Sequence, residues 1–145
     1  MPSVLAQPKS PTVKPIVLPT VAQANTPRPR VILPELHDPA TGRIDAQKVA
    51  DFLSVPLKAL AEALGLNYKA VHRTPGAPAF QQKLRSVKRI LELLDDFFGS
   101  PEIVRTWLNS PHPEFGGQSA LHAMLAGDTD AVVLILENAW NGVPV

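Results

Sequence analysis

The chain has 145 residues, no cysteine and a formal net charge of +1, and 45% of its residues are hydrophobic. This length suffices for one small domain, or for a domain with a tail. The absence of cysteine excludes disulfides and thiolate chemistry, and no apolar run approaches the roughly 18–20 residues that span a membrane. Because the chain does not begin with a basic cluster and an apolar block, the sequence predicts a cytoplasmic protein without a signal peptide.

The small net charge hides an asymmetry along the chain. The net charge is +2 over residues 1–40, +3 over 41–98 and −4 over 99–145. A basic middle and an acidic end indicate two surfaces with different partners, although ordinary charge scatter also produces differences of this size. The same boundaries divide the chain into a tail, a helix-turn-helix-like region with a long helix, and a C-terminal helical region.

Residues 1–40 have the composition of a disordered, proline-rich tail. Nine of the sixteen prolines lie in residues 1–39, and their spacing leaves no room for a helix and interrupts any strand ladder. This composition favours an extended, polyproline-like chain without a core. The alternative is a segment that becomes ordered on a partner, with Val31-Ile32-Leu33 as its anchor. Residues 1–39 are therefore predicted to be dispensable for folding.

Three short helices are expected after the tail. Asp45 is suited to cap the first, and Pro56 restarts the chain after a break. Gly65 ends the second helix and Asn67 caps a third, which stops before Pro75 because proline disfavours α conformation in the residue before it.

The second and third helices have the spacing of a helix-turn-helix. That motif needs a small residue where the helices cross, a turn residue four positions later and an apolar residue six positions further; Ala61, Gly65 and Val71 meet these requirements. Many helical corners match by chance, so a corner that only packs is the alternative. A recognition helix here would contact phosphates and base edges. The candidate DNA-binding residues are Asn67, Tyr68, Lys69, His72 and Arg73.

A long helix is predicted from Phe80 to Phe98, because apolar residues recur there at intervals of three and four. Its charges oppose the helix dipole, with basic residues in the first half and Asp95 and Asp96 in the last turn. The basic half either contacts DNA or is a solvated face, and the acidic pair is expected to be an exposed helix end. The basic residues are Lys83, Arg85, Lys88 and Arg89.

Three further helices complete an all-α bundle of about seven. One starts at Ser100-Pro101 and runs to about Asn109, and the others lie near 119–126 and 129–141. The run Val132–Leu136 is β-branched at its start, but Asp128-Thr129-Asp130 before it favours a helix N-terminus. We therefore expect a buried helix there.

Between two of these helices lies the segment WLNSPHPEFGG, residues 107–117. Proline fixes φ, and paired glycines allow positive φ or a close backbone approach. A loop that is rigid at one end and permissive at the other holds a specific shape, and such loops between helices usually present a surface. The alternative is a long corner that only packs.

The longer segment WLNSPHPEFGGQSALHAML, residues 107–125, resembles the signature of the MbcA/ParS/Xre family of antitoxins. That pattern is roughly W-L, two polar residues, P-x-P, G-G, a hydroxyl residue with a following Pro, then L-x-x-L-L. Residues 136–143 are similar to the last helix and Gly-Val exit of the family. Ala120 departs from it, since proline usually stands there and pre-sets φ, so its loss should loosen the helix start slightly.

This resemblance implies an antitoxin of a type II toxin–antitoxin pair. Family partners are toxins with a RES fold that consume or transfer from NAD, and the antitoxin blocks their active site. The helix-turn-helix half would dimerise and repress its own operon, so operator DNA and a homodimer or hetero-oligomer with toxin are implied. The chain end, residues 142–145, is a candidate plug. The candidate toxin-binding residues are Trp107, Asn109, Pro111, Pro113, Gly116, Gly117, Gly142, Val143, Pro144 and Val145.

No catalytic residue, metal site or cofactor is predicted. The histidines His37, His72, His112 and His122 lack metal-ligand spacing, and the last two are expected to be surface or capping residues. No phosphate-binding loop, nucleophile elbow or dinucleotide fingerprint occurs. The alternative functions are a stand-alone helix-turn-helix regulator without a toxin and a scaffold that binds protein only. A toxin reading frame beside this one would separate the antitoxin from both.

Overall fold

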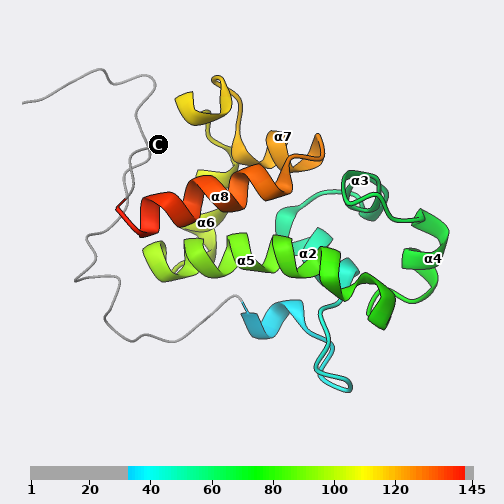
Figure 1. Cartoon of the computed structure of the whole chain (residues 1–145). Helices are drawn as coiled ribbons and strands as arrows, with labels where there is room; N and C mark the ends of the chain where they lie inside the picture. Colours follow the sequence, from blue (N-terminus) through cyan, green and yellow to red (C-terminus); the bar gives the residue numbers. More distant parts are fainter. Residues whose placement is uncertain (1–32, 143–145) are drawn as a thin grey trace, which may run out of the picture.

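The computed structural model describes residues 33–142, and this part of the chain is all-α (Figure 1). It contains seven α-helices and three short 3-10 helices, and no β-strand occurs among the described residues, which confirms the predicted fold class. The elements are η2 (Leu33–Leu36), α2 (Ala46–Leu53), α3 (Leu57–Ala63), α4 (Tyr68–Arg73), η3 (Pro78–Phe80), α5 (Gln81–Phe98), α6 (Pro101–Asn109), η4 (Pro113–Phe115), α7 (Ala120–Leu125) and α8 (Thr129–Trp140).

Side-chain caps start four of the α-helices where the sequence predicts them. In each case the side-chain oxygen accepts a hydrogen bond from the backbone N–H three residues later, which satisfies one of the free donors of the first turn. Helix α8 differs, because Asp128 makes no such side-chain bond although it occupies the N-cap. The caps are Asp45 for α2, Asn67 for α4, Ser100 for α6 and Ser119 for α7.

Helix α5 is the centre of the fold and packs against α6, α8 and η2 (Figure 1). Its predicted apolar stripe is buried, with Leu84, Leu91 and Leu94 fully inaccessible to solvent. Helix α8 runs beside it in the same direction, since Arg89 of α5 contacts Glu137 and Phe97, two turns later, contacts Trp140. This pair of helices joins the two halves of the molecule.

The last turns of α5 differ from the prediction. Asp95 is only 2% exposed, so the expectation of an exposed acidic helix end is wrong for this residue, and Asp96 is half-buried. Helices α6 and α8 both pack on α5, so they bury more of its surface than the single apolar stripe predicted from the sequence. The periodicity of a single helix does not report how many neighbours it has.

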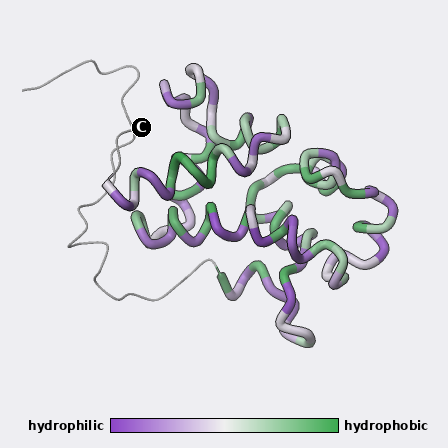
Figure 2. Tube along the Cα trace, in the orientation of Figure 1, coloured by the Kyte–Doolittle hydropathy of each residue, from purple (hydrophilic) through white to green (hydrophobic). Residues whose placement is uncertain are grey.

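Helix α8 also differs in part from the buried helix that was expected. Val132 and Leu136 are fully buried, whereas Leu134 between them is 58% exposed. Figure 2 shows a continuous hydrophobic stretch in the middle of α8, in front of the molecule. A helix in contact with the core along one side must turn some residues of a continuous apolar run toward solvent.

The predicted tail ends earlier than residue 40. Leu36 is fully buried, and its carbonyl accepts a hydrogen bond of 2.9 Å from the N–H of Asp45. His37 forms an isolated bridge with Ile44, and its Nδ1 lies 2.6 Å from the Leu33 carbonyl. Residues 33–40 therefore belong to the folded domain, because a short 3-10 turn tolerates Pro34 while it buries a leucine. The rest of the predicted tail, residues 1–32, lies outside the described residues.

Candidate functional site

Helices α3 and α4 pack together at the positions that the sequence spacing singled out, although many helical corners share this packing. Ala61 and Val71 are both 1% exposed, and Gly65 between the helices has a φ of +70°. A positive φ is open to glycine without the steric cost that other residues meet, so Gly65 allows the turn that brings α4 against α3. This corner forms one end of the molecule (Figure 1).

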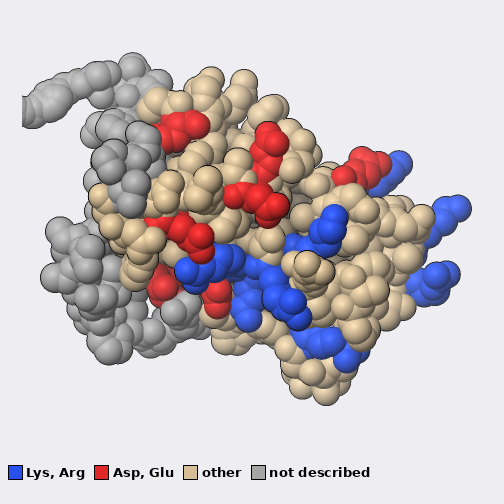
Figure 3. Space-filling view, viewed as in Figure 1, with Lys and Arg blue, Asp and Glu red and all other residues tan. Residues whose placement is uncertain are grey.

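The outer side of α4 is exposed and basic. Lys69, His72 and Arg73 are exposed, and Tyr68 is 36% exposed with its ring 5.7 Å from that of His72. Figure 3 shows lysine and arginine side chains projecting from the α3–α4 end of the molecule. Asn67 is also exposed, but its side-chain oxygen already caps α4 through the Ala70 N–H. All five predicted residues are therefore exposed, and the Asn67 side chain also caps α4.

The segment after α4 is held by residues that sequence analysis did not single out. The Gln81 side chain exchanges two hydrogen bonds with the backbone of Ile44, at 2.8 and 2.9 Å. Arg43 Nε donates to the Gly76 carbonyl at 2.8 Å, and Ala46 N–H donates to the Pro75 carbonyl at 2.9 Å. These bonds fix the exit of α4 to the start of α2. No sequence signal marks them, because the partners lie far apart in the chain.

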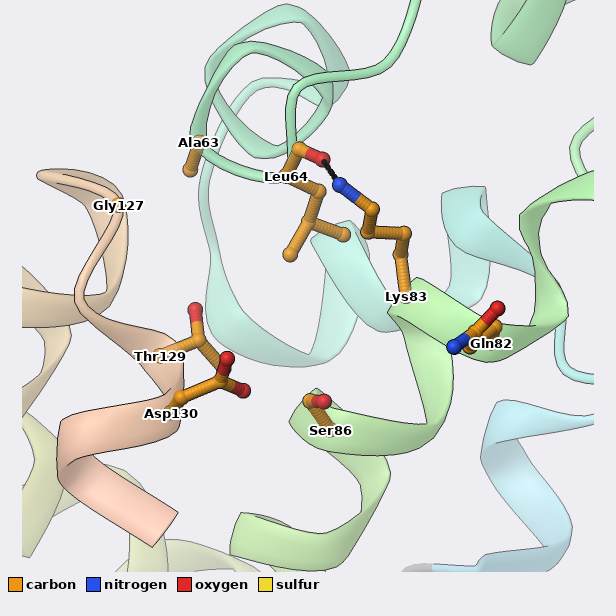
Figure 4. Close-up of a pocket in the computed structure, with 8 residues that line it drawn as sticks. All are labelled: Ala63, Leu64, Gln82, Lys83, Ser86, Gly127, Thr129 and Asp130. Carbon is orange, nitrogen blue, oxygen red and sulfur yellow. Dashed lines mark hydrogen bonds between the residues drawn. The ribbon is translucent and has the colours of Figure 1, made fainter.

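Lys83 braces the same corner from the other side. Its Nζ donates to the Leu64 carbonyl at the end of α3, at 3.0 Å. Both residues line a cleft of about 290 Å³, whose other side is formed by the start of α8. Figure 4 shows Lys83 reaching up to Leu64, with Thr129 and Asp130 on the facing side. A cation at the C-terminal end of a helix also interacts favourably with the helix dipole. Lys83 is thus a brace for α3 rather than a free basic residue.

The loop between α6 and α7 is shaped by three packed aromatic rings. Trp107 stacks on His112 with ring centroids 4.5 Å apart, and Phe115 meets both rings edge-on. His112 Nε2 lies 3.0 Å from the Trp107 carbonyl, within hydrogen-bond reach. His112 is 7% exposed, so the surface alternative is wrong for it, whereas its contact with a carbonyl of the last turn of α6 agrees with the capping alternative. It is buried because proline on both sides turns the chain back over the end of α6.

Backbone bonds close the loop. His112 N–H donates to the Gln118 carbonyl and Gly117 N–H donates to the His112 carbonyl, each at 3.0 Å. Gly116 and Gly117 have φ values of +65° and +84°, and no atom lies within 4 Å of the Cβ that either would carry. These glycines are therefore needed for backbone conformation and not for space.

The structure divides the predicted toxin-binding residues into a support and a surface. Trp107 is 8% exposed, so it lies under the loop and offers little contact area of its own. The exposed residues are Asn109, Pro111, Pro113, Gly116, Gly117 and, at the end of α8, Gly142. Val143, Pro144 and Val145 of the predicted plug lie outside the described residues.

Arg105 joins α6 to α2. Its Nε donates to the Phe52 carbonyl at 2.9 Å, and its guanidinium carbon lies 4.2 Å from the centre of the Phe52 ring. Arg105 is the single basic residue of the acidic segment 99–145. The positive charge of Arg105 is therefore held against the last turn of α2. The other charged residues of segment 99–145 are all acidic.

Two classes of site are not found in the described part of the chain. No group of three or more histidine, aspartate or glutamate side chains there could hold a metal ion. No helix from residue 33 to 142 is both long and apolar enough to cross a membrane.

The described part of the chain thus combines an exposed basic helix, α4, with a loop between α6 and α7 that packed rings hold in shape. Residues 93–138 match the family model described as the antitoxin Xre/MbcA/ParS C-terminal toxin-binding domain. Residues 93–138 are therefore similar to the toxin-binding domain of the Xre/MbcA/ParS antitoxins, which confirms the resemblance predicted from the sequence for this part of the chain. Comparisons with curated proteins and with solved structures gave no match.

The matched segment runs from the second half of α5 through α6, the loop and α7 to the last turns of α8. It includes the aromatic support of the loop and the loop surface. It ends before Gly142, so the candidate plug lies beyond it.

Proposed function

We propose that this protein is the antitoxin of a type II toxin–antitoxin system and that it neutralises a RES-fold, NAD-consuming toxin by covering its active site. The observation that carries the proposal is the toxin-binding family match over residues 93–138. The loop supports it, because proline and glycine residues project from a base that three packed rings hold in one shape. A preformed surface loses less conformational entropy on binding than a flexible one.

Inhibition of this kind needs no chemistry on the antitoxin. It needs a complementary surface and an element that enters or covers the toxin's substrate site. The loop supplies the surface, and residues 142–145 are the proposed plug at the end of α8. The predominance of acidic residues in segment 99–145 would suit a basic partner surface.

Growth of cells that co-express the cognate toxin tests this function. The parent chain should restore growth and copurify with the toxin. Truncation of residues 142–145 should restore toxin activity while copurification persists, because the loop surface remains. If the truncated form still protects fully, occlusion must act through the loop and the plug hypothesis fails.

Asn109→Arg tests the loop surface separately. Asn109 is exposed at the end of α6, and its side chain bonds only to the Arg105 carbonyl of the same helix. A large cation there should weaken copurification without loss of helical circular dichroism. Glu62→Arg on exposed α3 is the matched control and should bind toxin as the parent does. Equal binding by both variants would place the toxin elsewhere.

We further propose that α4 is a DNA-recognition helix through which the protein represses its own operon. The exposed basic side of α4 favours this role. Lys69→Ala with Arg73→Ala should weaken operator binding and reduce its salt slope by roughly two units, at about 0.9 per lost phosphate contact. Lys48→Ala on α2 is a control and should leave the slope unchanged. A double variant that binds operator as the parent does would contradict the assignment.

The exposed basic side of α4 also supports a second candidate function, that of a stand-alone DNA-binding regulator. That protein would have no toxin partner. A toxin reading frame beside this gene would favour the antitoxin, and its absence together with operator binding would favour the regulator.

A further inference from the structure

The cleft of about 290 Å³ between the end of α3 and the start of α8 is lined by polar groups that the functions above do not use. We call it the α3–α8 cleft. One wall comes from the end of α3, Leu64 and the first turns of α5, all outside the segment that matches the toxin-binding family. The other wall comes from Gly127, Thr129 and Asp130, inside that segment. No residue of the α6–α7 loop lines the cleft.

Thr129 is buried in the wall of the cleft, yet its hydroxyl makes no hydrogen bond among residues 33–142. The residue is only 6% exposed, and Figure 4 shows its hydroxyl directed into the space between α8 and Lys83. Buried hydroxyl groups are normally hydrogen-bonded, because burial without a partner costs free energy. A small molecule in the cleft can reach a side chain at this depth, whereas a flat macromolecular surface cannot.

Other hydrogen-bond donors line the same space. Lys83 donates one of its three N–H groups to the Leu64 carbonyl, at 3.0 Å, and two remain. The Ser86 hydroxyl also lines the cleft and makes no hydrogen bond within the described part of the chain. No side chain caps α8, so the N–H groups of its first turn are open to a ligand, and the helix dipole favours negative charge there. This set of donors fits a carboxylate.

Asp130 makes the cleft unfavourable for a simple anion. It lines the cleft beside Thr129 and makes no ion pair with Lys83 or with any other described residue. A free phosphate or acetate would meet the Asp130 carboxylate, and a free amine would meet the Lys83 ammonium group. A molecule that carries both charges satisfies both groups. The volume lies near the lower limit of about 300 Å³ for ligand sites, so that molecule must be small.

We propose that the α3–α8 cleft binds a free zwitterion of amino-acid size. Its carboxylate accepts hydrogen bonds from Lys83 Nζ, the Thr129 hydroxyl and the first turn of α8, and its ammonium group pairs with the Asp130 carboxylate. Because the two walls come from the two halves of the molecule, the ligand joins the α3–α4 corner to the C-terminal helices. It therefore stabilises the folded state by mass action.

Amide NMR titration of the isotope-labelled full chain, without toxin or DNA, tests the proposal. The probes are glycine, L-alanine and L-serine as zwitterions, acetate as an anion and methylammonium as a cation, all at one ionic strength. At least one zwitterion should shift the amides of Leu64, Gly127 and Thr129 in a saturable way and leave those of α4 and the α6–α7 loop unshifted. Acetate and methylammonium should bind at least roughly tenfold more weakly, because each satisfies only one of the two charges.

Two variants with matched controls assign the contacts. Thr129→Val removes the hydroxyl with little change in shape and should weaken zwitterion binding roughly threefold to tenfold, as expected for one hydrogen bond. Thr129→Ser keeps the hydroxyl and should bind as the parent does.

Asp130→Asn should weaken zwitterion binding and strengthen acetate binding, because it removes the negative charge from the cleft. Asp128→Asn is its control, since Asp128 is an exposed acid at the same helix end that does not line the cleft. Asparagine is also a good N-cap residue, so this variant should bind as the parent does. Helical circular dichroism should be unchanged in all four variants. The readout contains neither toxin nor DNA, so failure of the proposed antitoxin or repressor function would not change it.

Three results would overturn the proposal. The first is a chain whose cleft amides respond to none of the zwitterions up to about 50 mM, where even a weak site fills. The second is acetate binding as tight as that of the zwitterions, with Asp130→Asn strengthening both, which would make the cleft an anion site. The third is equal binding by Thr129→Val and the parent, or shifts spread evenly over the chain, which would show that the buried hydroxyl contacts no ligand.

Discussion

The α3–α4 corner and the α6–α7 loop both present exposed residues, but they hold them in place differently. On α4 the exposed side chains stand on a capped helix whose own contact with the core is Val71, at 1% exposure. In the loop, the exposed prolines and glycines take their shape from buried rings beneath them. Substitution on α4 can therefore change binding without changing the fold, whereas in the loop the shape of the surface and stability depend on the same residues.

The largest expected effect on stability comes from a substitution under the α6–α7 loop, and it should affect the loop and not α4. Trp107→Ala removes the ring on which His112 and Phe115 pack, and should destabilise the domain by about 3–5 kcal/mol. The loop should lose its shape at the same time, so toxin binding should fall while operator binding by the remaining folded protein persists. Urea denaturation gives the stability. A loss below about 1 kcal/mol, well under the usual cost of deleting a buried aromatic ring, would show that the packed rings do not hold the loop.

Leu36→Ala should rank second and tests the start of the domain. Its side chain is fully buried, so truncation should cost about 2–5 kcal/mol. Leu33→Ala is the matched control and should cost less, because Leu33 is only partly buried. Urea midpoints of the two variants measure the difference. Equal, near-parental midpoints would return residues 33–40 to the tail that the sequence predicted.

The Lys69→Ala and Arg73→Ala double variant should have almost no effect on stability. Both residues are exposed and make no ion pair among the described residues, and such surface substitutions usually stay within about 0.5 kcal/mol. The expected result is an unchanged urea midpoint together with weakened operator binding. A large drop in the urea midpoint would mean that the exposed residues of α4 also stabilise the fold, as the residues of the loop are expected to do.

The smallest expected effect concerns Glu102 at the start of α6. Hydrogen bonds from its own backbone N–H and from the Ser100 side chain lower the pKa of this carboxyl, and Arg105 adds to the shift. A lowered folded-state pKa means that the stabilisation is present above the ordinary glutamate range and is lost as pH falls through the folded value. Glu102→Gln should therefore differ slightly from the parent near neutral pH and not at strongly acidic pH, as measured by urea midpoints.

The sequence by itself determined where most helices begin and end, and it singled out the two segments that we propose as binding surfaces. Caps, prolines and glycines act within a few residues of their own position, so Asp45, Asn67, Ser100 and Ser119 could be assigned from local pattern. The motif of the α6–α7 loop could also be recognised from the sequence, because W-L, P-x-P and G-G lie close together in the chain.

The tertiary structure alone decided how these elements support one another. The burial of Leu36, Asp95 and His112 depends on which elements pack over them, and periodicity within one helix or turn does not contain that information. The clasp of Gln81 on Ile44 and the brace of Lys83 on Leu64 join residues that are 37 and 19 positions apart. Contacts of this kind form only when distant parts of the chain pack together, so the shape of the proposed binding surfaces depends on the whole fold and not on any local segment.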